Sequence, residues 1–98
     1  MLLKIIFLTF LLCACVVQPT QQALQIIQTR DLAAVSRCKF IAPVRGGALV
    51  NEPNAASRSA QAVALNAAAE LGATHVMWQN FAQRGAVSQT LGDAYICN

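Results

Sequence analysis

The clearest periodic pattern in the chain predicts one helix in its middle. Hydrophobic residues recur there with the three- and four-residue spacing of one helix face, at Ala60, Val63, Ala64, Ala67, Ala68 and Leu71. Asn54 or Ser57 is suited to cap the start of this helix, and Gly72 stands where a helix ends in the left-handed conformation. Because alanine dominates the stripe, we expect a sheet to approach the helix closely.

Shorter runs of alternating or β-branched residues predict strands on both sides of this helix. These runs are residues 24–29, 38–45, 74–81 and 93–97. The order strand, strand, helix, strand, strand predicts an α+β fold, with a small antiparallel or mixed sheet of about four strands and one helix packed on one face.

Turn residues and polar runs predict where these strands stop. Alternation places Cys38, Phe40, Ala42 and Val44 on one face of the second strand. Pro43 predicts that this strand lies at a sheet edge or ends early, and Gly46-Gly47 predicts its end. The polar stretch 83–91, which contains Gly85, predicts a loop.

The first fourteen residues have a different pattern, since twelve of them are hydrophobic. Lys4 precedes an apolar run from Ile5 to Val17, which is shorter than the about 20 residues that span hydrocarbon. A positive start, a short apolar run and small residues before a break are typical of a secretory signal peptide. This segment fits a lipid-anchored protein. The alternatives are a secreted protein in which Cys15 is a structural thiol, and a protein that keeps the segment as an uncleaved anchor.

The stretch Leu12-Cys13-Ala14-Cys15 resembles the bacterial lipobox. The resemblance implies that residues 1–14 are a lipoprotein signal peptide, and that Cys15 receives a diacylglyceryl thioether and, after cleavage, a third acyl chain. Such an anchor would be stable. Cys13 departs from the pattern, where alanine, serine or threonine is commoner. Val16, in place of the aspartate that retains lipoproteins in the inner membrane, implies the outer membrane, facing the periplasm.

The rest of the chain divides into a short polar segment and one domain. Residues 15–23 are polar and glutamine-rich after the cysteine and predict a lipidated tether. Residues 24–98 then form one periplasmic domain. With 56% hydrophobic and 11% charged residues, the chain is not disordered for most of its length. The few charges left after cleavage are dispersed, so we expect no nucleic-acid partner.

Four cysteines in so short a chain indicate an oxidising compartment. If Cys13 leaves with the signal peptide and Cys15 is acylated, Cys38 and Cys97 remain and predict a disulfide. The bond would close a loop of about 60 residues and stabilise the domain by about 4 kcal/mol. The alternative, a metal site that includes His75, lacks the close spacing of zinc ligands.

Side chains with catalytic potential occur singly along the chain. His75 is the only histidine and has no nucleophile or carboxylate partner evident in the sequence. Glu70 and Asp93 are isolated carboxylates, and no serine stands in a nucleophile motif. We therefore expect no enzyme, no cofactor and no metal.

Two further stretches carry a resemblance to a family of small bacterial envelope lipoproteins. They are Asn66-Ala67-Ala68-Ala69-Glu70-Leu71-Gly72-Ala73-Thr74-His75-Val76 and Gly92-Asp93-Ala94-Tyr95-Ile96-Cys97. Together with Cys15 and Cys38 they resemble the family grouped as domain of unknown function 4156. Thr74 departs from the asparagine that is common there. The layout is more distantly similar to the outer-membrane lipoprotein sensor of the Rcs envelope-stress phosphorelay. That sensor has two domain disulfides, whereas this chain can form only one.

The sequence thus predicts a lipid-anchored envelope protein that acts through protein–protein contact, in envelope maintenance or stress sensing. Its predicted partners are the membrane, through the lipid at Cys15, and an envelope protein that the sequence does not identify. The alternative is a small-ligand or metal-binding periplasmic module that uses His75, Met77 and Trp78, and a weak hydrolase or transferase is a third hypothesis without a nominated residue.

Overall fold

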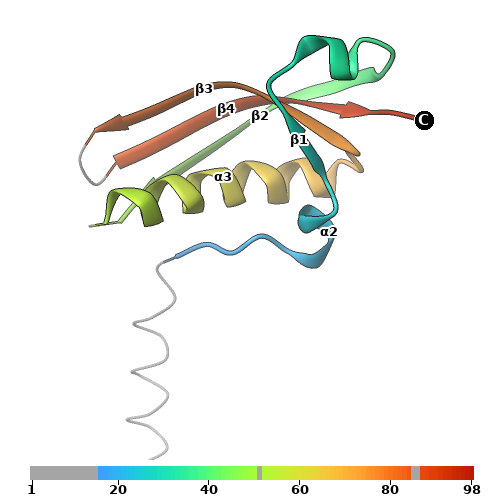
Figure 1. The fold of residues 1–98 in the computed structure, drawn as a ribbon. Helices are drawn as coiled ribbons and strands as arrows, with labels where there is room; N and C mark the ends of the chain where they lie inside the picture. The colour runs from blue at the N-terminus through green and yellow to red at the C-terminus, as the bar shows by residue number, and fades with distance from the viewer. Residues whose placement is uncertain (1–15, 51, 85–86) are drawn as a thin grey trace, which may run out of the picture.

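The computed structural model describes residues 16–50, 52–84 and 87–98, which form two helices, one 3-10 helix and four strands (Figure 1). The elements in chain order are α2 (Gln21–Leu24), β1 (Ile27–Thr29), η1 (Leu32–Val35), β2 (Lys39–Leu49), α3 (Pro53–Glu70), β3 (His75–Arg84) and β4 (Val87–Ile96).

The four strands form one mixed sheet in the order β1-β3-β4-β2. β1 pairs parallel with β3, whereas β4 pairs antiparallel with both β3 and β2. Helix α3 packs along one face, mainly over β2 and β4. The predicted α+β fold is therefore confirmed, and so is the edge position of the strand that contains Pro43. None of the described helices is long and apolar enough to cross a membrane.

Helix α3 begins four residues before Ser57 and ends at the predicted turn. The Glu52 carboxylate caps it by accepting hydrogen bonds from the backbone N–H groups of Asn54 and Ala55, at 3.0 and 2.7 Å. The predicted caps, Asn54 and Ser57, are wrong because both lie inside the helix. At the other end Gly72 has φ +80°, as predicted, and Ala73 N–H donates to the Ala68 carbonyl at 3.1 Å.

The positive φ at Gly72 gives a prediction for the helix end. The variant Gly72→Ala should lower the free energy of unfolding by about 1 kcal/mol, because a Cβ disfavours the left-handed region. Urea unfolding followed by circular dichroism measures the change. Gly72→Asn should lose less, since asparagine tolerates this conformation. Equal stability of Gly72→Ala and wild type would contradict the proposed role of this glycine.

Small residues allow α3 to lie directly on strand β2. Ala56, Ala60 and Ala64 are fully buried on the helix. A Cβ at Gly46 would overlap the Ala60 carbonyl and come within 3.0 Å of the Ala64 backbone nitrogen. The two backbones are therefore in contact at Gly46. The alanine-rich stripe predicted that a sheet would approach the helix closely, but it did not identify the strand.

The segment 16–20, here called the N-terminal strap, lies along the other side of α3 (Figure 1). Because α3 is covered by both the sheet and the strap, its buried residues exceed one stripe. Ser59, Ala62, Leu65 and Ala69 are buried, while Leu71 from the predicted stripe is exposed.

Two segments at the start of the domain differ from the sequence prediction. The predicted strand 24–29 is extended only from Ile27 to Thr29. Gln21–Leu24 is instead a helical turn, because the Thr20 hydroxyl accepts a hydrogen bond from Ala23 N–H at 3.1 Å. The tether predicted over 15–23 therefore contains structured residues from the strap onward, and its first residue, Cys15, lies outside the described residues.

Strand ends elsewhere also differ from the prediction. β2 continues through Gly46-Gly47 to Leu49, because Gly46 serves close packing against α3 and neither glycine makes a turn. The stretch 83–91 was predicted as a loop, but β3 extends to Arg84 and β4 begins at Val87. A bulge between Phe40 and Ala42 also separates the four residues predicted to share a face.

Candidate functional site: the open face of the sheet

The sheet has one face covered by α3 and one face that is largely open (Figure 1). On the open side, η1 covers only the end of the sheet near the start of β3, where Val35 is fully buried. The remaining part of this face is formed by the middle and far end of β2, β3 and β4.

The strand register fixes which side chains share the open face. Directly opposed residues of antiparallel strands point to the same side. From the η1 end to the hairpin end, the rows across β2, β4 and β3 are Phe40–Tyr95–His75, Pro43–Asp93–Met77, Arg45–Leu91–Asn80, Gly47–Gln89–Ala82 and Leu49–Val87–Arg84.

Large hydrophobic side chains are exposed along these rows. The exposed fractions are 50% for Phe40, 75% for Leu49, 44% for Val87 and 37% for Leu91. We define the open-face patch as these four residues together with Arg45, Asn80 and Gln89. Single exposed hydrophobic residues are ordinary, whereas several on one face indicate a contact surface.

A shallow hollow of about 470 Å³ lies within the open-face patch. Its lining residues are Arg45, Gly46, Gly47, Asn80, Ala82, Gln89, Thr90 and Leu91. The hollow exists because Gly47 and Ala82 flank Gln89 with almost no side chain. It offers an apolar wall at Leu91, amide groups at Asn80 and Gln89, and the positive charge of Arg45.

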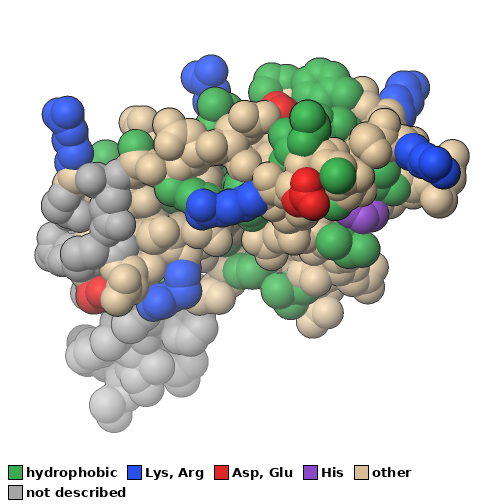
Figure 2. Space-filling view, turned by 45° about the horizontal axis from the view of Figure 1, so that its top comes forward, with side chains coloured by type: hydrophobic (Ala, Val, Ile, Leu, Met, Phe, Trp, Pro, Cys, Tyr) green, Lys and Arg blue, Asp and Glu red, His purple; other side chains and the backbone are tan. Residues whose placement is uncertain are grey.

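These groups can make both polar and apolar contacts. Amides and a guanidinium can hydrogen-bond a peptide, and an apolar wall can receive an apolar side chain. The lining residues include no carboxylate, thiol or imidazole that could act as general base or nucleophile. Lysine and arginine side chains are spread around the face in Figure 2 and form no single basic patch.

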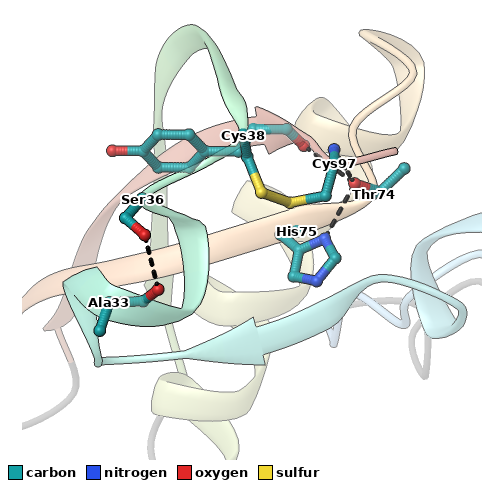
Figure 3. Close-up of a disulfide and its surroundings, with 7 residues drawn as sticks. Ala33, Ser36, Cys38, Thr74, His75 and Cys97 are labelled. Atoms are coloured by element: carbon teal, nitrogen blue, oxygen red, sulfur yellow. Dashed lines mark hydrogen bonds between the residues drawn. A yellow bond between two sulfur atoms is a disulfide. The ribbon is translucent and has the colours of Figure 1, made fainter.

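The covered end of the sheet holds the disulfide between Cys38 and Cys97, with 4.4 Å between their Cα atoms (Figure 3). The predicted pairing is therefore present. It joins the residue before β2 to the residue after β4. Phe40 and Tyr95 stack edge to face beside it, with ring centroids 5.7 Å apart.

His75 lies beside this disulfide and is held by its neighbour. Its Nδ1 is 2.8 Å from the Thr74 hydroxyl, which also accepts a hydrogen bond from Cys97 N–H at 2.7 Å (Figure 3). Among the described residues, no group of three or more histidine, cysteine, aspartate or glutamate side chains could hold a metal ion.

The three residues of the alternative binding module do not converge. His75 and Met77 lie on the open side of the sheet, in the two rows nearest the η1 end. Trp78 belongs to the hydrophobic core on the α3 side, where its indole N–H donates to Gln28 Oε1 at 3.0 Å. Strand alternation separates Trp78 from the other two side chains.

The aromatic residues of β3 form part of the core rather than a ligand platform. Trp78 and Phe81 pack with their ring centroids 5.5 Å apart. The Arg30 guanidinium carbon lies 4.4 Å from the Phe81 ring centroid and covers that ring.

Sequence reasoning identified the disulfide but missed the open-face patch. Its residues on β4 were assigned to a loop because Ser88, Gln89 and Thr90 are all polar. The structure alternates the exposed Val87, Gln89 and Leu91 with the buried Ser88 and Thr90, but the sequence carries no matching signal, because polar residues lie on both faces. The other candidate residue, Cys15, lies outside the described residues.

Compared with known proteins, the chain matches no family model, no curated protein and no solved structure. The resemblances to the lipobox and to domain of unknown function 4156 therefore stay predictions from the sequence.

Proposed function

We propose that this protein is a non-enzymatic lipoprotein of the bacterial envelope that binds another envelope protein through its open-face patch. In this proposal the lipid on Cys15 anchors it in the outer membrane, and the domain faces the periplasm. The single observation that carries the binding role is the exposure of four large hydrophobic side chains on one face of the sheet, where Leu91 also lines a hollow.

The composition of the patch supports a protein partner. Aromatic and aliphatic side chains form its centre and ends, while Arg45, Asn80 and Gln89 provide polar contacts between them. Interfaces commonly combine apolar anchors with a small number of hydrogen-bonding groups. The strands beneath the patch are already paired, so the backbone loses little conformational entropy on binding.

The disulfide and the dispersed polar side chains support the proposed compartment and the absence of catalysis. Cys38 and Cys97 are paired, as expected for a protein in an oxidising environment. The imidazole of His75 contacts a threonine hydroxyl at its Nδ1, a residue that supplies no charge. Stress sensing and envelope maintenance both fit a protein that works by contact alone.

Photocrosslinking in living cells tests the binding role. A photoreactive amino acid at position 49 or 91 should give a discrete crosslinked product with one envelope protein. The same amino acid at position 24, which is 63% exposed on α2 and lies off the patch, is the matched control. The same products from position 24 as from position 91, or none from the patch, would contradict the proposal.

A charge placed in the patch should weaken the contact. We expect Leu91→Arg to reduce the crosslink from position 49 by about tenfold or more, because a guanidinium would be buried opposite an apolar partner. The control Leu24→Arg should leave the yield unchanged. Thermal unfolding of both variants should remain near wild type, since both positions are exposed.

Intact-mass analysis of protein from native membranes tests the anchor separately. The mature chain should begin at Cys15 and carry the mass of diacylglyceryl and acyl groups, with Cys38 and Cys97 oxidised. Globomycin, which blocks cleavage of lipoprotein signal peptides, should cause a longer chain to accumulate. An unmodified Cys15 would contradict the lipoprotein assignment.

A further inference from the structure

We infer that the N-terminal strap clamps the domain to the membrane in one orientation, with the α3 flank against the lipid headgroups and the open-face patch directed away from them. The inference deepens the proposed function and rests on the proposed anchor at Cys15. The flank is defined here as Val16, Val17, Arg58 and Gln61, which line one hollow between the strap and α3.

Hydrogen bonds fix the strap along α3. Val17 N–H donates to the hydroxyl of the fully buried Ser59 at 3.3 Å. The Asn66 side chain binds the strap in both directions, since its Oδ1 accepts from Thr20 N–H at 2.9 Å and its Nδ2 donates to the Gln18 carbonyl at 3.1 Å. The Asn66 side-chain amide therefore hydrogen-bonds the backbone of the strap as the backbone of a neighbouring strand would.

The chain that follows the strap is held by the core. Ala23 and Ile26 are buried in the same hydrophobic cluster as Leu65 and Ala69 of α3. Burial of these side chains opposes detachment of the strap at its C-terminal end. Both ends of the segment are thus attached to one helix.

The short reach of the remaining chain limits how far the domain can stand from the bilayer. If residues 16–23 formed an extended tether, these eight residues would span roughly 25–30 Å. Because Val17 is already bonded to α3, only the two steps from Cys15 to Val17 remain, which span about 7 Å. An acylated Cys15 must lie at the headgroup level, because its lipid chains enter the hydrocarbon. Val17 and the α3 residues beside it must then lie close to the headgroups.

The layers of the fold determine the orientation that results. The strap lies on α3, α3 lies on the sheet, and the open face is the far side of that sheet (Figure 1). A membrane next to the strap therefore leaves Arg45, Gln89 and Leu91 on the surface turned toward the periplasm, where a protein partner can reach them.

Charge does not draw the flank to anionic lipids. Arg58 is the basic residue among the four that define it, and its guanidinium lies 4.0 Å from the Glu52 carboxylate, a partner of opposite sign. We therefore expect the orientation in vesicles of the zwitterionic lipid phosphatidylcholine as well as in anionic ones, and little dependence on salt.

Fluorescence quenching in vesicles tests this orientation. The lipidated protein, reconstituted in phosphatidylcholine vesicles, would carry a fluorophore at Arg58→Cys or at Gln89→Cys, both exposed positions. A nitroxide on the lipid headgroup should quench the label at position 58 several-fold more than the label at position 89. Equal quenching at both positions, in protein whose acylation is verified by mass, would overturn the orientation.

The variant Asn66→Ala tests the clamp itself. Loss of the amide should reduce the difference in quenching between the two positions, and amide hydrogen exchange of Thr20 should become faster by at least about tenfold. Asn80→Ala, the same substitution on the open face, should change neither reading. Unchanged exchange and quenching in Asn66→Ala would refute the clamp. An unmodified Cys15 would refute both the anchor and the orientation. The intact mass of the protein distinguishes the two results.

Discussion

Replacement of Gly46 by alanine is expected to lower the free energy of unfolding by about 3 kcal/mol or more, which is a large part of the stability of a domain this small. The added methyl group would overlap the Ala60 carbonyl on α3 and lie 3.0 Å from the Ala64 nitrogen. Both are backbone atoms of a helix interior, so no side-chain rotation can relieve the overlap. The whole helix would have to move away from β2.

The neighbouring glycine provides a matched control. A Cβ at Gly47 would point to the open face, and the nearest atom to it would be the Ser88 carbonyl oxygen at 3.9 Å. Gly47→Ala should therefore change the stability by less than about 0.5 kcal/mol. Urea unfolding of the three proteins, monitored by circular dichroism and Trp78 fluorescence, measures the difference. Equal stability of Gly46→Ala and Gly47→Ala would contradict the backbone contact between α3 and β2.

Helix α3 could be predicted from sequence because its signals are local. The spacing of its alanines and the glycine at position 72 depend on residues within one element. Its first turn was misplaced because glutamate is a less common cap than asparagine or serine, yet Glu52 accepts two backbone N–H groups. The number of buried faces could not be predicted, because the strap that covers Ser59 and Leu65 comes from a segment without an apolar period.

The hairpin of β3 and β4 was partly missed because polar residues lie on its buried side. Ser88 and Thr90 are almost fully buried beneath α3, and the Thr90 hydroxyl donates to the Asn80 carbonyl at 3.5 Å. A pattern that equates polar residues with exposure assigns this stretch to a loop. Small hydroxyl side chains instead let the alanine-rich helix lie close to the sheet.

The open-face patch was beyond the sequence prediction because two bulges decide its composition. The irregularity between Phe40 and Ala42 turns Phe40 toward the open side, while Val44 faces α3. The one between Trp78 and Asn80 similarly places Asn80 opposite Leu91. Each bulge exchanges the two faces of a strand. The disulfide, in contrast, could be predicted by counting cysteines. With Cys13 and Cys15 assigned to the predicted lipoprotein signal, Cys38 and Cys97 remain to pair.

Removal of the disulfide is the second change with a large expected effect. The double variant Cys38→Ser/Cys97→Ser should lose about 4 kcal/mol, because the bond closes a loop of 59 residues in the unfolded chain. For a domain of this size that loss corresponds to a melting temperature lower by about 15–30 °C. The ends of the sheet are still paired at Lys39–Ile96 and Phe40–Tyr95, so we expect a less stable domain with the same fold.

Reductant provides the control for this variant. Wild-type protein in dithiothreitol should unfold at nearly the same urea concentration as the double variant, and dithiothreitol should not affect the variant itself. The single variants Cys38→Ser and Cys97→Ser should resemble the double variant, because either one removes the whole cross-link. A difference of less than about 1 kcal/mol between oxidised wild type and the double variant would show that the unfolded chain gains little freedom from opening the loop. In that case the core beneath α3, with Gly46 at its closest point, would supply nearly all of the stability of the domain.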